Sequence, residues 1–76
     1  MNIQNLVNMA NDMSNFFNSA AGEADAPREI ASFITRHWDP RMRSQLIEHG
    51  KSGGEGLYPA TAAAVKLLVP PGPRPA

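Results

Sequence analysis

The sequence has 76 residues, the length of one small domain, and its seven basic residues balance its seven acidic residues. This neutral balance gives no overall attraction for nucleic acid or for an anionic membrane surface. The sequence contains no cysteine, which excludes disulfides and thiolate metal sites.

Helical spacing of apolar residues over positions 3–20 predicts a first, amphipathic helix with Asn2 as its N-cap. The opposite side is rich in asparagine, a weak helix former, so packing must hold this helix. The stripe fits either the domain core or a docking face. The segment lacks a basic leader region, so we expect no signal peptide, no membrane span and a cytoplasmic location. The stripe consists of Ile3, Leu6, Val7, Met9, Ala10, Met13, Phe16, Phe17 and Ala20.

A second helix is predicted over residues 27–38. Gly22 can adopt the positive φ that ends the first helix, and Pro27 suits the first turn of the second. We interpret His37 as a partly buried structural histidine, because the one other histidine, His49, leaves any metal site short of ligands. The apolar side of this helix carries Ile30, Phe33, Ile34, His37 and Trp38.

A sharp corner is predicted directly after Trp38. Asp39 is a good N-cap, and Pro40 fits the first position of a helix because its fixed φ is already helical. A third helix is therefore predicted over residues 40–49, with Gly50 as its stop.

The third helix carries a candidate contact surface. Ile47 lies one turn after Arg43, beside the apolar stripe, on a side that could lie outside the small core. The alternative is that Arg41 and Arg43 are ordinary solvated charges, which usually contribute little to stability.

The remaining chain predicts a loop, a short helix and a tail. Residues 50–56 are glycine-rich but lack the spacing of a phosphate-binding loop, so we expect a flexible connector. A fourth helix is predicted over 59–69, and the proline-rich residues 70–76 are expected to be extended or disordered. The expected fold is all-α: a small bundle of three to four short helices in a single helical domain, residues 1–69, with a disordered tail. The fourth helix has Leu57, Thr61, Ala64, Val65 and Leu68 at helical spacing.

The residues alone predict no catalytic, cofactor-binding or metal site. No pair of titratable groups and no activated nucleophile stands out. Two other classes remain: a helical subunit that docks on a larger protein, and a small helix-turn-helix nucleic-acid-binding protein that would use Arg36, Arg41 and Arg43. The neutral net charge disfavours nucleic acid.

Three stretches together resemble the delta subunit of the soluble, NAD-dependent, molybdenum-containing formate dehydrogenases of bacteria. Their most specific parts are W-D-P-R-M-R and G-G-E-G-L-Y-P. The stretches are NLVNMANDMSNFF at 5–17, ITRHWDPRMRSQLIEH at 34–49 and GGEGLYPATAAAVKLL at 53–68.

This resemblance implies an accessory subunit that is not itself an enzyme. The larger subunits of such a complex would hold bis-molybdopterin guanine dinucleotide, iron–sulfur clusters and the flavin that reduces NAD, and this chain would hold none of them. The implied partner is the large catalytic subunit and, through it, the diaphorase subunits. The implied role is assembly or stabilisation, with help in cofactor insertion or retention as a further option.

We expect the docking surface at the corner between the second and third helices. Arginine, tryptophan and tyrosine are enriched among binding hot spots because they combine large contact area with directional hydrogen bonds. Trp38 equally fits a core role through its helical spacing with Ile34. The expected interface residues are Arg36, Trp38, Asp39, Pro40, Arg41, Arg43, Ile47 and Tyr58.

Overall fold

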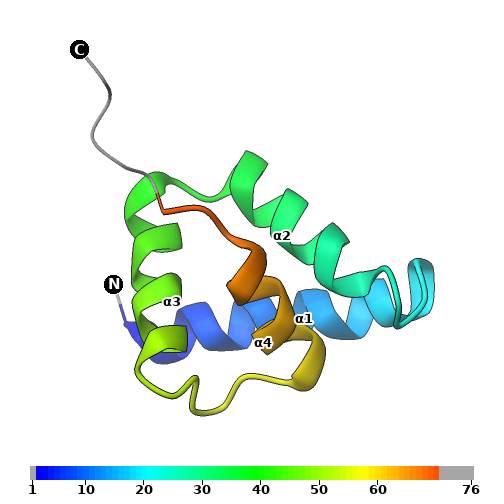
Figure 1. Ribbon diagram of the computed structural model, residues 1–76, viewed down its shortest axis with the longest axis horizontal. Helices are drawn as coiled ribbons and strands as arrows, with labels where there is room; N and C mark the ends of the chain where they lie inside the picture. The colour runs from blue at the N-terminus through cyan, green and yellow to red at the C-terminus, as the bar shows by residue number, and fades with distance from the viewer. Residues whose placement is uncertain (1, 71–76) are drawn as a thin grey trace.

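Four α-helices form the computed structural model, which describes residues 2–70 (Figure 1). They are α1 (Ile3–Ala20), α2 (Ala26–His37), α3 (Pro40–Lys51) and α4 (Pro59–Leu67), and the described residues contain no strand. The all-α prediction is confirmed, and the predicted bounds agree with the observed ones to within two residues. None of the described helices is long and apolar enough to cross a membrane. Of the tail predicted over residues 70–76 to be extended or disordered, residues 71–76 lie outside the described residues.

The local signals at the helix ends act as expected. The Asn2 side chain caps α1 by accepting a hydrogen bond of 2.8 Å from the backbone N–H of Gln4. The Asp39 carboxylate caps α3 by accepting one of 3.0 Å from the N–H of Met42. Gly22 has a φ of 87° just after α1. These three predictions are confirmed because each depends only on residues close in the chain.

Gly50 does not end α3, so the expected stop at this residue is wrong. The helix continues to Lys51. A Cβ atom at Gly50 would lie 2.6 Å from Cγ1 of Val65, which is far closer than packed carbon atoms come. Gly50 therefore allows α3 and α4 to approach closely, while Gly53 and Gly54, with φ of 119° and 66°, make the turn that follows.

One hydrophobic cluster joins all four helices. In Figure 1, α1 and α2 run in roughly opposite directions, α3 stands at one end, and α4 fills the space beside them. The most extensive helix–helix contact is between α2 and α4, where small side chains such as Ala64 permit a close approach. The cluster consists of Leu6, Ala10, Ile30, Ala31, Ile34, Trp38, Leu46, Ile47, Ala64, Val65 and Leu68.

The apolar stripe of α1 is divided between the core and the surface. Leu6, Val7 and Ala10 are buried, which confirms the core interpretation for the first half of the helix. In contrast, Met9 is exposed and Phe16 keeps 63% of its surface accessible. The stripe is broader than the surface that α2, α3 and α4 can cover.

Candidate partner-docking surface

Trp38 lies at the corner between α2 and α3, and its side chain is buried there. Trp38 and Asp39 have extended backbone conformations, which separate the two helices. The Trp38 side chain is only 6% exposed and belongs to the hydrophobic core. It therefore stabilises the corner by packing.

Arg43 links three segments of the chain. Its Nε donates a hydrogen bond of 3.2 Å to the backbone oxygen of Val69, and its Nη1 donates one of 3.4 Å to the oxygen of Thr35. Thr35 lies in the last turn of α2, where carbonyl groups lack helical partners and a positive charge is favourable. Arg43 is half-buried and joins α3 to the end of α2 and to the segment after α4, a role that sequence analysis did not anticipate.

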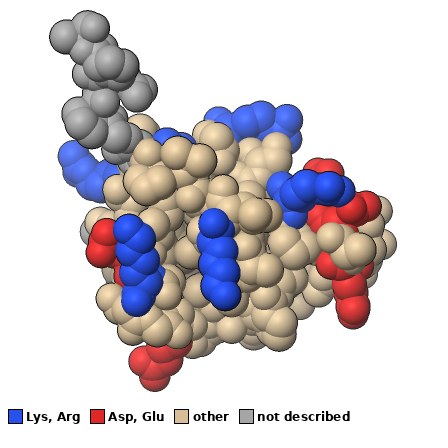
Figure 2. Space-filling view, in the orientation of Figure 1, with Lys and Arg blue, Asp and Glu red and all other residues tan. Residues whose placement is uncertain are grey.

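The exposed part of the corner consists of Arg36, Asp39, Pro40 and Arg41, which we call the arginine corner. Figure 2 shows basic side chains along the edge where α2 meets α3, whereas acidic side chains gather around the turn between α1 and α2. The molecule measures 40 Å along its longest axis. Charge is thus partly separated along the protein, although Asp39 lies within the arginine corner and Arg28 lies at the acidic turn.

Ile47 lies in the core, beneath the cover of α4. It is 6% exposed and belongs to the same cluster as Val65 and Leu68. The expectation that Ile47 could lie outside the core was wrong because α4 covers this side of α3, and nothing local to α3 indicates that cover.

Tyr58 is not brought to the arginine corner. It is 45% exposed and lies just before α4, in the segment that follows the opposite end of α3. The structure therefore assembles only part of the expected interface at one place, and Tyr58 belongs to a different surface.

Asn11 fixes the segment that contains Tyr58, and sequence analysis did not single it out. Its Nδ2 donates to the backbone oxygen of Gly56 at 2.8 Å, and its Oδ1 accepts from the N–H of Tyr58 at 3.0 Å. Asn11 is 7% exposed. The available signal was its spacing, because Val7, Asn11 and Ser14 share the buried side of α1.

The two histidines have different surroundings, and neither belongs to a catalytic arrangement. Nε2 of His49 lies 2.7 Å from the backbone oxygen of Glu55, which anchors the glycine-rich loop. His37 is exposed, so the interpretation of it as partly buried was wrong: its ring contacts Phe33, with 4.4 Å between centroids, at the open end of α2. Within residues 2–70, no three histidine, aspartate or glutamate side chains gather closely enough to hold a metal ion.

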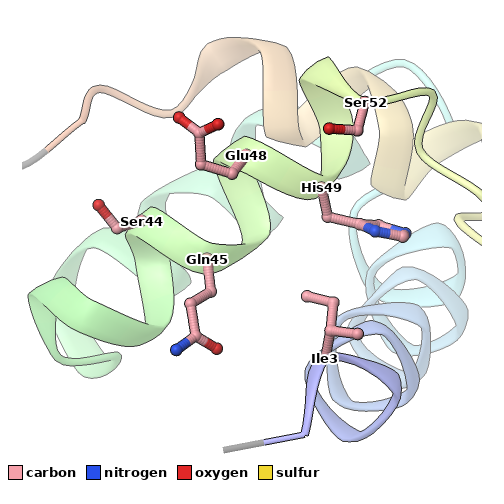
Figure 3. A pocket seen from close by; sticks show the side chains of 6 residues that line it. All are labelled: Ile3, Ser44, Gln45, Glu48, His49 and Ser52. Carbon is pink, nitrogen blue, oxygen red and sulfur yellow. The ribbon is translucent and has the colours of Figure 1, made fainter.

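A hollow of about 400 Å³ lies between the start of α1 and α3 (Figure 3). The figure shows Ile3 facing α3 near His49, while the carboxylate of Glu48 points to the other side of the helix. An acid–base pair would need its two groups directed at a common point. This hollow offers none, because its two titratable side chains diverge.

All three phenylalanines of the sequence lie on the side of the molecule formed by α1 and α2, and none is fully buried. Ring centroids are 5.0 Å apart for Phe16 and Phe17, and 6.4 Å apart for Phe17 and Phe33. With His37 they form a continuous aromatic row. Sequence analysis placed these residues on apolar helix faces but could not tell that the two faces meet at the surface.

The family model for the NADH-dependent formate dehydrogenase delta subunit, FdsD, matches residues 5–65. The chain belongs to this family. This match confirms the resemblance noted in the sequence. The matched range contains the arginine corner, Asn11 and the glycine-rich loop. No curated protein and no solved structure matches the chain.

The residues of this chain do not fit the redox groups that the resemblance implies for a formate dehydrogenase. Iron–sulfur clusters are bound by cysteine thiolates, and the sequence has no cysteine. The histidine and carboxylate side chains of residues 2–70 form no metal-binding group.

Proposed function

We propose that this chain is a noncatalytic accessory subunit that docks on the large molybdenum-containing subunit of a cytoplasmic formate dehydrogenase and stabilises it. The observation that carries the proposal is the family match over residues 5–65. The small size of the chain supports it, because a domain this small buries only about 60% of its unfolded surface and benefits from a partner. By holding the large subunit in its folded form, the chain would also help this subunit to take up or retain its cofactor. The diaphorase subunits would be connected to this chain only through the large subunit.

We place the docking surface at the arginine corner. Arg36 and Arg41 are exposed, and they project from two helices whose relative position is held by the buried Trp38. Rigid presentation lowers the entropy cost of binding, and arginine is a frequent hot-spot residue. The complementary surface on the large subunit would be acidic.

Co-purification tests this proposal. The tagged chain should recover the large subunit from cells that produce the complex, while the purified chain alone should oxidise no formate. Replacing Arg36 and Arg41 with alanine should keep the helical circular dichroism spectrum but weaken binding by at least about 2 kcal/mol, roughly thirtyfold. Arg43 is left intact because its loss would also loosen the fold.

Arg28→Ala is the matched control. Arg28 is an exposed arginine that pairs with Asp25 at the start of α2, away from the corner. It should leave recovery unchanged. Equal recovery of the wild-type chain and of the variant lacking Arg36 and Arg41 would contradict the corner as the interface. Specific binding of duplex DNA that this variant loses would instead favour the nucleic-acid alternative.

A further inference from the structure

A groove of about 650 Å³ lies between the end of α3, the glycine-rich loop and α4, and its lining extends to Pro70 in the segment after α4. Its apolar lining includes Ile47, Leu57, Val65 and Leu68. Lys51 and Lys66 also line it, and they are the only two lysines in the sequence. We call it the lysine groove. Figure 2 shows two basic side chains on the face formed by α3 and α4, and an acidic side chain lies directly beside one of them.

The charges of the lysine groove are not neutralised within the described part of the chain. The ion pair found among residues 2–70 joins Arg28 to Asp25, elsewhere in the fold. Each lysine lies in the last turn of its helix, where a cation favours the helix dipole. That local effect explains a basic residue at each helix end, but it does not explain why both amines border the same apolar groove.

Three N–H groups of the glycine-rich loop beside the lysine groove are bonded within the chain and are not free to bind a phosphate group. The N–H of Ser52 donates to the oxygen of Glu48 at 3.0 Å, and the N–H of Gly54 donates to the oxygen of His49 at 2.9 Å. The N–H of Gly53 is likewise bonded, to the oxygen of Gly50 at 3.3 Å. A phosphate-binding loop needs such N–H groups to be free. An anionic occupant would therefore be held by the lysine amines and not by these three N–H groups.

We infer that the lysine groove binds a segment of a larger formate dehydrogenase subunit in which apolar side chains are flanked by aspartate or glutamate. The apolar side chains would fill the space over Val65 and Leu68, and the carboxylates would pair with Lys51 and Lys66. The inference rests on the proposed function for the identity of the partner, and on charge complementarity for its chemistry. The cavity is large enough for a few side chains, within the range of about 300–1,000 Å³ typical of binding pockets.

Zero-length crosslinking of the purified complex tests the inference directly. A carbodiimide joins a lysine amine to a carboxylate that lies in contact with it. Peptide mass analysis should find Lys51 or Lys66 of this chain joined to acidic residues of a larger subunit. Crosslinks that link the two lysines only to carboxylates of this chain or of a second copy of it would overturn the inference.

Charge reversal gives a second test that separates this inference from the proposed function. Replacing both lysines with glutamate should reduce recovery of the large subunit at least about tenfold at moderate ionic strength, whereas replacing both with arginine should largely preserve it. Failure of the wild-type chain to recover the large subunit would overturn both proposals. Recovery by wild type that charge reversal leaves unchanged would overturn this inference alone.

The control for charge is Arg28→Glu, which is compared with the single variant Lys66→Glu because the two substitutions change the net charge equally. It should leave recovery intact. Circular dichroism of each variant establishes folding. If the variant with both lysines replaced by glutamate does not fold, the crosslinking experiment still tests the inference. The variant with both lysines replaced by arginine tests it as well. This variant keeps both positive charges, so its failure to recover the large subunit while folded would contradict charge pairing.

Discussion

Asn11 shows how a single polar side chain can join segments that are far apart in the sequence. The hydrogen bonds that its side-chain amide makes with the backbone of Gly56 and Tyr58 hold the segment before α4 against the middle of α1. The other asparagines of α1 on the exposed side, such as Asn5, have no comparable role. Asn11 therefore has a specific structural function on the buried side of α1, which the exposed asparagines of this helix do not share.

We predict that Asn11→Ala lowers the free energy of unfolding by about 1–2 kcal/mol, because two hydrogen bonds of ordinary strength are lost. Urea denaturation followed by circular dichroism measures this change. Asn5→Ala is the control, and it should be neutral or slightly stabilising because alanine is the better helix former. Equal effects of the two substitutions would show that the Asn11 bonds contribute nothing to stability.

At the scale of secondary-structure elements, the contact between α3 and α4 depends on the missing side chain at Gly50. Alanine would normally favour a helix over glycine by about 1 kcal/mol. Here its Cβ would meet Cγ1 of Val65, a β-branched side chain with little freedom to move. The steric cost and the propensity gain oppose each other.

We predict that steric strain wins, since overpacking a core costs about 1–3 kcal/mol. Gly50→Ala should lower the free energy of unfolding by about 1 kcal/mol in the wild-type chain. In a Val65→Ala background the obstructing methyl group is absent, so the same substitution should be neutral or stabilising. Urea denaturation of the four proteins in this double-mutant cycle gives the coupling energy, and a stabilising effect of Gly50→Ala in both backgrounds would refute the strain argument.

At the scale of the whole molecule, one small core has to stabilise four helices. The aromatic row and the lysine groove lie at the edge of this core, since Phe17 packs against it and Ile47, Val65 and Leu68 belong to it. A core of this size rarely supplies more than about 3–5 kcal/mol. Binding to the folded form alone raises stability by mass action, by about 2.7 kcal/mol at a partner concentration one hundred times the dissociation constant.

We therefore expect amide hydrogen exchange in this chain to slow when the purified large subunit is added. Exchange followed by mass spectrometry reports on peptides of this chain alone, so the partner does not obscure the signal. Protection should extend across the core helices and increase with partner concentration. Exchange that is identical with and without the large subunit would contradict stabilisation by docking.

The sequence alone determined the helices, because their signals are local. Asn2 and Asp39 cap helices through residues two or three positions away, and Gly22 supplies a positive φ where α1 ends. The sequence also indicated the family, through motifs that lie within the matched range 5–65. For the candidate site, it placed Arg36 and Arg41 at the corner where both are found exposed.

Only the tertiary structure decided which faces are covered. Ile47 is buried because α4 packs over α3, whereas Tyr58 is held by Asn11 at a distance from the corner. Lys51 and Lys66 come together only because the same two helices meet at Gly50. Helical periodicity tells which residues share a face of one helix, but contact between helices depends on side-chain volumes and chain direction across the whole fold, which no local pattern contains.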